Sequence, residues 1–308
     1  MDIPTVTQQF INALTLGSIY ALIALGYTMV YGIIELINFA HGDVFMVGAF
    51  VAMWLLTIPL GLTGALNDPI QLALVLVPVL LVTMVVMGLV GVTIERFAYR
   101  PLRSAPRLAP LITAIGVSFI LQNIIQVLFG PSPRNVPQLI SFDNRFEVLG
   151  ANISYLSILI LILTIGLIIG LQLFINRTSL GRAMRSTAQD REAAALMGVD
   201  INRTIAATFF IGSALAGAAG LVHGLYFGSI IFNLGFFAGL KAFTAAVLGG
   251  IGNTTGAALG GFLIGFVEVG AAAAGYARWS EALIFAVLVI VLVFRPTGLL
   301  GQQLGERA

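Results

Sequence analysis

The sequence predicts an all-α polytopic membrane protein, and its composition and apolar patterning carry that prediction. Hydrophobic residues make up 59% of the 308 residues and charged residues only 9%, whereas about a quarter of the residues in soluble proteins are charged. The apolar residues gather in long runs, and a helix needs roughly 20 such residues to cross the bilayer core. The net charge of +2 gives no support for binding to nucleic acid. We therefore expect one transmembrane domain over residues 1–308.

The expected helices follow one another along the chain. Residues 1–9 contain no basic segment and no cleavage site, so the first apolar run is expected to be retained rather than removed as a signal peptide. A shorter glycine-rich stretch, 236–251, is a candidate crossing. The prediction is eight or nine crossings, with nine favoured and one of them short or broken. The apolar runs that are long enough to cross are 10–34, 44–63, 70–93, 108–129, 153–175, 204–229, 254–275 and 280–295.

Two arginine-rich segments set the expected orientation. Residues 95–107 and 177–203 together hold nine of the fifteen lysine and arginine residues, and short loops rich in these residues mark the cytoplasmic side of a membrane. Counting spans from these segments places the N-terminus and the loop 130–152 outside. That loop contains three prolines and is predicted to be ordered, either as a plain connector or as a docking place for a partner. The C-terminus is cytoplasmic only if 236–251 also crosses.

Two segments, 35–43 and 248–256, are predicted to interrupt helices. They lie at roughly corresponding places in the two halves of the chain, and such pairs are typical of transporters built from internal repeats, where broken backbone lines a cavity. Small residues also recur at every fourth position within 212–228 and 252–260. This spacing lets helices pack closely in lipid, and close packing is favoured over a direct part in solute passage.

The segment 177–203 is predicted to contain a short cytoplasmic helix. Ser186 followed by Gln189 is typical of a helix N-terminus, and Gly198 is a natural stop after a run of strong helix formers. A helix of about ten residues is too short to span the membrane. It either rests on lipid headgroups or docks a soluble subunit.

Polar residues inside the apolar runs are candidate functional groups because they are costly in a membrane. Glu268 forms either a buried structural pair or part of a solute path. His41 and His223 lack the spacing of metal ligands, so no metal site is expected. A further set lies on one helix face at four-residue steps, placed to bond a solute or a neighbouring helix: Ser118, Gln122 and Gln126.

No motif in the sequence predicts an enzyme. A phosphate-binding P-loop needs a lysine followed by serine or threonine, but the single lysine, Lys241, is followed by Ala242. No nucleophile elbow and no pair of carboxylates suited to hydrolysis is present. If ATP drives this protein, another chain must hydrolyse it.

Several motifs occur in a fixed order from one end of the chain to the other. They are LGSIYAL (16–22), GYTMVYGII (26–34), INFAHG (37–42), IERFAYRPLR (94–103), GRA (181–183), AALMG (194–198), KAFTAAVLGGIG (241–252) and RPTGLLG (295–301). In these motifs the chain resembles the LivH-type permeases of branched-chain amino acid ABC transporters. The resemblance covers essentially the whole chain and is weakest in the loop 130–152.

This resemblance implies a permease subunit that moves branched-chain or other neutral amino acids across the bacterial inner membrane. The implied partners are a second related permease of the LivM type, two cytoplasmic ATPase subunits that carry ATP and Mg²⁺, and a periplasmic solute-binding protein. This chain itself would bind no cofactor. The same family includes permeases for urea and short amides. From the residues alone, a secondary ion-coupled transporter with Glu35, Asp43 and Glu268 as a proton relay remains a rival.

The resemblance also implies that the segment 177–203 is the loop that couples the permease to its ATPases. The residues expected to carry the coupling are Arg182, Arg185, Asp190, Glu192, Ala194, Leu196 and Gly198. The residues expected along the solute pathway are Asn38, His41, Gln122, Gly249, Gly250, Gly252 and Glu268.

Overall fold

Helices form almost all of this protein in a computed structural model that describes residues 2–36, 38–66, 68–103, 105–106, 108–140, 145–148 and 150–301. The α-helices are α1 (Ile3–Ile34), α2 (His41–Thr57), α3 (Pro69–Ile94), α4 (Leu108–Phe129), α5 (Tyr155–Arg177), α6 (Ser179–Gln189), α7 (Arg191–Leu196), α8 (Ile201–Phe227), α9 (Leu234–Gly249), α10 (Thr254–Ala273) and α11 (Ser280–Phe294). Shorter turns are η1 (Glu95–Tyr99), η2 (Arg100–Leu102) and η3 (Ala277–Trp279). The strands are β1 (Arg134–Asn135), β2 (Arg145–Val148), β3 (Ala151–Ser154) and β4 (Ser229–Ile230). The predicted all-α class is confirmed.

Apolar helices occupy the apolar runs that the sequence predicted. Within the described residues, seven helical segments are long and apolar enough to cross a membrane, while α2 and α9 are shorter apolar helices. Because α2 and α9 are shorter than a candidate span, the favoured count of nine crossings stays a prediction. α2 ends at Thr57, although the predicted span continued to residue 63. It stops because Pro59 has no N–H to extend the hydrogen-bond ladder and Gly61 takes a left-handed φ of +59°.

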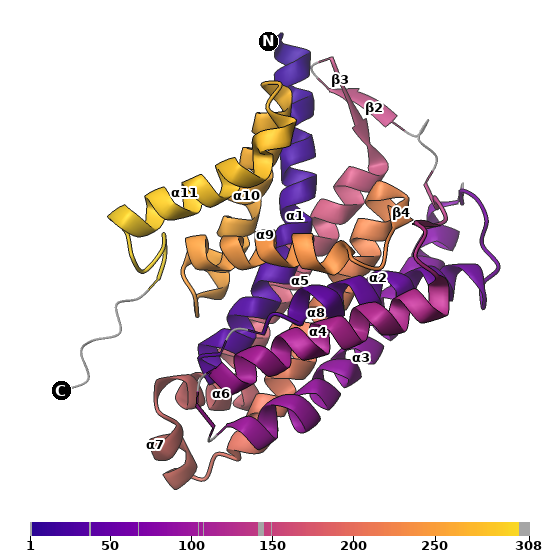
Figure 1. The fold of residues 1–308 in the computed structure, drawn as a ribbon. Coiled ribbons are helices and arrows are strands. Elements are labelled where there is room, and N and C mark those ends of the chain that lie inside the picture. Colours follow the sequence, from indigo (N-terminus) through magenta and orange to yellow (C-terminus); the bar gives the residue numbers. More distant parts are fainter. Residues whose placement is uncertain are drawn as a thin grey trace.

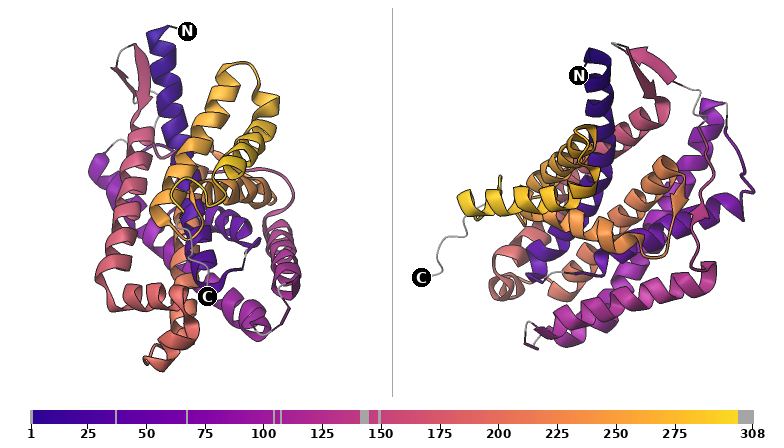
Figure 2. Two further views of the ribbon diagram at one scale, coloured as in Figure 1. Left: turned by 90° about the vertical axis from the view of Figure 1, so that its left-hand side faces the viewer. Right: turned by 45° about the horizontal axis from the view of Figure 1, so that its top comes forward.

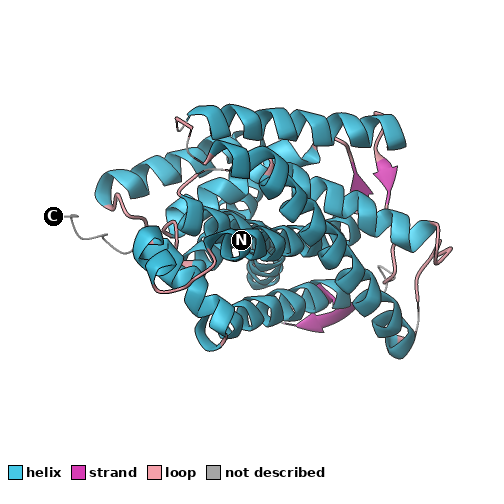
Figure 3. Cartoon of the chain, turned by 90° about the horizontal axis from the view of Figure 1, so that it is seen from below, coloured by secondary structure: helices cyan, strands magenta, loops and turns pink. Residues whose placement is uncertain are grey.

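Two helices, α1 and α8, form the centre of the bundle. In their most apolar stretches 94% of the residues of α1 and 78% of those of α8 are buried, against 17% in α4 and α5. In the view from below, α1 is seen along its length in the middle of the projection, with other helices around it (Figure 3). The outer helices expose large apolar side chains such as Ile112, Val127 and Ile162. These helices therefore present the surface that a lipid bilayer would cover.

Small residues allow the central helices to approach closely, as their spacing predicted. A Cβ atom added at Gly220 of α8 would lie 2.5 Å from the Ala49 nitrogen and the Phe45 oxygen of α2. In the same way, a Cβ atom at Gly265 of α10 would lie 2.5 Å from the backbone of Gly17 in α1. These contacts support the packing role of the glycine ladders, since backbones that touch leave no room for a side chain.

Replacing Gly220 by alanine is expected to destabilise the bundle by about 1–3 kcal/mol, the usual cost of overpacking. The measurement is thermal unfolding of the purified protein in detergent. Gly116→Ala is the matched control, because Gly116 lies in α4 with nothing within 4 Å of an added Cβ atom. There alanine should be neutral, or stabilising by up to about 1 kcal/mol through helix propensity. Equal melting temperatures for the two variants would contradict the prediction.

Both predicted interruptions are present. The first separates α1 from α2, and Glu35 ends α1 with a left-handed φ of +54°. The second separates α9 from α10, where Gly250 and Gly252 have φ values of +109° and +89°. The segment near the end of the described chain holds this second interruption, because the Leu299 and Leu300 nitrogens donate to the Leu248 and Gly249 oxygens at 2.9 and 3.0 Å. The internal repeat suggested by the two interruptions stays a prediction.

The two arginine-rich segments lie at one end of the molecule. Figure 1 shows α6 and α7 at the bottom, while the N-terminus and the β2–β3 hairpin are at the top. The same separation is visible in the further views (Figure 2). Residues 145–148 of the predicted external loop pair with β3, and Arg134 and Asn135 pair with β4 at the end of α8. The described parts of the loop are thus ordered, as predicted.

Candidate functional site

The segment after α5 folds into two short helices rather than one. Thr178 caps α6 by accepting from the Gly181 nitrogen at 3.0 Å. Asp190 caps α7 by accepting from the Glu192 and Ala193 nitrogens at 2.8 and 3.0 Å. Gly198 follows α7 with a left-handed φ of +86°, which confirms that it ends the helix.

The predicted helix start at Ser186 is wrong. Ser186 lies inside α6, where its hydroxyl donates to the Arg182 oxygen at 3.0 Å. The helix before Gly198 has six residues instead of about ten. At Asp190 the backbone is extended (φ −153°) and the carboxylate accepts from the first N–H groups of α7, so a new helix begins there. The chain is therefore broken between α6 and α7.

Removing the Asp190 cap is expected to loosen α7 locally. Asp190→Ala should cost about 1 kcal/mol of local stability, so amide hydrogens of α7 should exchange about fivefold faster. Hydrogen exchange read by mass spectrometry measures this. Asp2→Ala is the matched control, because Asp2 occupies the N-cap position of α1 without a capping hydrogen bond. Unchanged exchange in α7 would show that tertiary contacts alone hold the helix.

Two large apolar side chains project from the end of α7. Leu196 is 89% exposed and Met197 is 85% exposed, whereas Ala194 on the opposite side is only 4% exposed. We call Leu196 and Met197 the apolar tip. Adjacent, nearly fully exposed apolar side chains at the extremity of a protein are typical of contact surfaces. The other predicted coupling residues, apart from Ala194, are exposed as well: Arg182, Arg185, Asp190, Glu192 and Gly198.

Arginine side chains tie these two helices to the transmembrane bundle. Arg185 of α6 donates to the Ile175 oxygen of α5 and to the Asn176 side-chain oxygen. Arg191, the first residue of α7, donates to the Ile33 oxygen of α1, with its Nη2 atom at 2.6 Å. α7 is therefore connected to the last turn of α1, directly before the first interruption.

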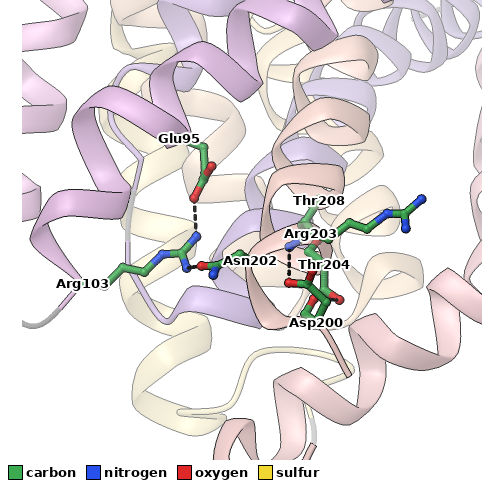
Figure 4. A network of polar contacts seen from close by, with 7 residues as sticks. All are labelled: Glu95, Arg103, Asp200, Asn202, Arg203, Thr204 and Thr208. Carbon is green, nitrogen blue, oxygen red and sulfur yellow. Dashed lines mark hydrogen bonds and ion pairs between the residues drawn. The ribbon is translucent and has the colours of Figure 1, made fainter. Parts of the chain in front are cut away.

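A polar network joins the two arginine-rich segments (Figure 4). Arg103 forms an ion pair with Glu95, which is only 2% exposed, and its Nη1 atom donates to the Asn202 side-chain oxygen of α8 at 2.6 Å. Burial lowers the pKa of the Arg103 guanidinium, Glu95 raises it, and Arg100 and Arg191 lower it. The guanidinium stays charged, as arginine does in proteins. The network therefore holds the segment between α3 and α4 against the start of α8.

Sequence reasoning did not identify this network. The sequence feature that indicates the network is Glu95, because a carboxylate at the end of an apolar run needs a partner when it is buried. Asp200 completes the local structure by capping α8, where it accepts from the Arg203 nitrogen at 3.0 Å.

The predicted pathway residues Asn38 and His41 lie at the first interruption. Asn38 is 3% exposed and accepts from the Tyr99 hydroxyl at 3.0 Å. His41 is fully buried, and its ring meets the Tyr27 ring edge-on at a centroid distance of 4.7 Å. Asn38 also lines a narrow cavity together with Ile251 of the second interruption. The structure thus brings the two interruptions together.

The glycines of the second interruption face a different neighbour. An added Cβ atom at Gly250 would lie 2.7 Å from the Gly301 Cα atom, and one at Gly249 would meet the backbone of Gly256. At Gly252 it would meet nothing within 4 Å. Gly249 and Gly250 therefore serve the close packing of α9, α10 and the following C-terminal segment.

The remaining pathway candidates are hydrogen-bonded to neighbouring helices. Gln122 donates to the Asp43 Oδ1 atom at 3.0 Å, and Ser118 donates to the other oxygen of the same carboxylate. Glu268 accepts from the Tyr20 hydroxyl at 2.7 Å and from Lys241 at 2.6 Å. Hydrogen bonds between helices therefore account for Ser118 and Gln122 of α4, which contact Asp43 of α2. They also account for Glu268 of α10, which contacts Lys241 of α9.

Ligand groups for a metal ion are not assembled in the described part of the chain. There, no three or more His, Asp or Glu side chains come together as a metal site would require. Nor does any hydrogen bond or ion pair between described residues join Glu35, Asp43 and Glu268, the three carboxylates of the rival proton relay.

Comparison with known proteins shows the family. Residues 9–292 match the family described as "Branched-chain amino acid transport system / permease component". The chain belongs to this permease family. The resemblance stated from the sequence motifs is thereby confirmed, and the family is one of transport proteins.

Relatives of this permease match nearly its whole length. It is 45% identical over 303 residues to the high-affinity branched-chain amino acid transport system permease protein BraD of Pseudomonas aeruginosa, with 97% of each chain covered. It is 42% identical to the corresponding permease protein LivH of Escherichia coli strain K12, again with 97% of each chain covered. The autoinducer 2 import system permease protein LsrD of Salmonella paratyphi B is 30% identical over 64% of this permease and 62% of LsrD. No solved structure matches this permease significantly.

Proposed function

We propose that this permease is a transmembrane subunit of an ATP-driven importer for branched-chain amino acids, with residues 1–308 as one permease domain. The observation that carries the proposal is its identity of 45% and 42%, over 97% of the chain, to permease proteins named for high-affinity branched-chain amino acid transport. The chain has no P-loop of its own, so the ATPase is a separate subunit. The complete importer contains a second, related permease, two ATPases that bind ATP and Mg²⁺, and a periplasmic solute-binding protein.

We place the N-terminus and the loop 130–152 on the periplasmic side of the bacterial inner membrane. The arginine-rich end, with α6 and α7, faces the cytoplasm because short basic loops stay on that side. Nine crossings then bring the C-terminus to the cytoplasm. The solute-binding protein docks at the end that carries the β2–β3 hairpin.

The ATPases bind the apolar tip, Leu196 and Met197. Movement of the ATPases displaces α7, and the hydrogen bond from Arg191 to the Ile33 oxygen passes that displacement to α1. The contact from Arg185 to α5 carries it to a second transmembrane helix. Asp190 and Gly198 keep α7 short and stiff by defining its two ends.

The solute passes beside the two interruptions, which meet at the narrow cavity between Asn38 and Ile251. His41, at the start of α2, borders this region from within the bundle. Gln122 and Glu268 hold the helices that surround the path, through Asp43 and Lys241 respectively. Gly249 and Gly250 let the second interruption bend where α9 meets α10, and Gly252 continues it with space for movement.

Reconstitution in proteoliposomes tests the proposal. The permease, its partner permease, the ATPases and the binding protein should together take up leucine, isoleucine and valine only when ATP is supplied. Omission of the ATPases should abolish uptake. Urea and acetamide serve as competitors. If they inhibit the uptake and leucine does not, the permease belongs to the other substrate class of the family. Leucine accumulation by the permease alone, abolished by a protonophore, would overturn the proposal in favour of secondary transport.

A further inference from the structure

A cavity opens between the coupling segment and the transmembrane bundle. Its volume is about 210 Å³, and it lies between the end of α1, the η1–η2 segment, the first residue of α7 and one face of α8. This volume is smaller than the roughly 300–1,000 Å³ of pockets for drug-sized ligands, so only a small solute fits. The mechanism proposed above makes no use of this cavity.

Charges of both signs line the cavity. Arg103 and Arg191 contribute guanidinium groups, and Glu35 contributes a carboxylate. Glu95 stands next to Arg103 as its ion-pair partner. These four groups sum to zero net charge, which suits a ligand that carries one positive and one negative group. A simple anion such as phosphate would meet the Glu35 carboxylate without compensation.

The guanidinium groups still have N–H groups to offer. A guanidinium has five donors in a fork that matches a carboxylate. Arg191 directs its Nε and Nη2 atoms at the Ile33 oxygen, which leaves its Nη1 atom. Burial is the main cause that lowers the pKa of the Arg103 guanidinium, and repulsion from Arg100 and Arg191 lowers it further. A carboxylate placed between Arg103 and Arg191 would relieve that repulsion.

The remaining wall is apolar. Leu36 and Leu102 are partly exposed and line the cavity, as do Ile205 and Phe209 of α8, which are each 1% exposed. Aliphatic and aromatic surface beside a few charged groups is the usual composition of a site for a small amphipathic ligand. A branched aliphatic side chain would displace water from this wall.

The backbone of Glu35 supplies independent support. Glu35 is the single non-glycine residue with positive φ in the described ranges, at +54°. The left-handed conformation costs a side chain other than glycine roughly 1–2 kcal/mol, and residues held in it cluster at functional sites. A glycine would end α1 without this strain. The carboxylate, which is exposed at the cavity, is therefore the feature for which the strain is tolerated.

We infer that this cavity is a cytoplasmic binding site for a zwitterionic α-amino acid with a small apolar side chain. The carboxylate of the ligand binds Arg103 and Arg191, its ammonium group binds Glu35, and its side chain packs on Leu36 and Leu102. The inference rests on the proposed function, because it makes the imported solute the occupant. The site lies on the side where the solute is released, so it responds to amino acid already inside the cell.

The test uses the purified complex of both permeases and the ATPases, without the binding protein. Equilibrium binding of radiolabelled leucine is compared with that of isocaproate, which lacks the amino group, and isoamylamine, which lacks the carboxylate. Leucine should bind saturably, and each analogue should bind about tenfold more weakly or worse, since each loses one charged contact. Glu35→Gln should weaken leucine binding by about tenfold and leave isocaproate binding unchanged. Glu147→Gln, an exposed carboxylate at the opposite end of the molecule, should change neither.

Several results would overturn the site. They are no saturable leucine binding, equal binding of leucine and isocaproate by the wild-type complex, and displacement of leucine by inorganic phosphate or phosphatidylglycerol at lower concentration than by leucine itself. Arg191→Gln removes a carboxylate contact of the cavity and should weaken the binding of leucine and of isocaproate alike. Binding along the solute pathway would not respond to this change, so the test holds even where Glu35→Gln fails to assemble. ATP-dependent leucine uptake without direct leucine binding rejects this site alone, whereas absence of leucine uptake rejects the proposed function.

Discussion

Replacing both residues of the apolar tip by aspartate, Leu196→Asp with Met197→Asp, is expected to abolish import. The two side chains are 89% and 85% exposed, so the permease loses no internal packing when they change. At an interface, however, a few well-packed and desolvated residues near the centre carry most of the binding energy, and an aspartate left unpaired there is costly. We expect the ATPases to bind more than about tenfold more weakly. Copurification of the ATPases with tagged permease, and ATP-dependent leucine uptake, measure the effect.

Val148→Asp is the control for the copurification of the ATPases, since Val148 lies at the end where the solute-binding protein docks. Val148 is an exposed apolar residue of β2 at the opposite end of the molecule, and its replacement should leave the ATPases bound. Melting temperatures of both variants in detergent should equal that of the wild type. If the double variant copurifies with ATPases and imports leucine at the normal rate, α7 rests on lipid headgroups instead of docking on the ATPases.

The transmembrane architecture was largely predictable from the sequence because the bilayer imposes its length on each apolar run. Runs such as 108–129 and 153–175 match α4 and α5 within about two residues. The interruptions were also predictable, since polar residues and glycine at 35–43 and 248–256 have local signatures. The end of α2 was missed because a proline near a span end competes with a hydrophobic pattern that continues past it.

The candidate site was less predictable because its partners are distant in sequence. No residue near Lys241 in the sequence indicates its partner. Lys241 pairs with Glu268, 27 positions away, and Glu268 also bonds to Tyr20, 248 positions away. Similarly, Ser186 and Asp190 both have the local signature of an N-cap. Only the three-dimensional course of the chain decides that Asp190 is the residue that caps α7. Local chemistry therefore names the candidates, and tertiary contacts select among them.

Replacing Lys241 by methionine is expected to cause a large loss of stability. Its Nζ atom lies 2.6 Å from the Glu268 carboxylate between α9 and α10, and the two side chains are 14% and 20% exposed. Methionine keeps the length of the side chain but leaves Glu268 without its cation inside a transmembrane segment. An unpaired charge at the centre of a transmembrane helix costs roughly 2.5–3.5 kcal/mol. Thermal unfolding in detergent and the yield of membrane-inserted protein measure the loss.

A compensating change separates loss of the ion pair from loss of lysine itself. In Lys241→Met with Glu268→Gln, the amide still accepts from the Tyr20 hydroxyl, and no charge remains to be desolvated. Replacing both partners of a buried pair is often neutral, whereas removing one is costly, so the double variant should recover most of the lost stability. Glu281 provides the matched single control, because it lies 4.0 Å from Lys241, is 54% exposed, and should tolerate glutamine. If the double variant is as unstable as Lys241→Met alone, the ion pair is not what holds α9 to α10. Full recovery of stability without recovery of leucine uptake would add a transport role for these charges to their structural one.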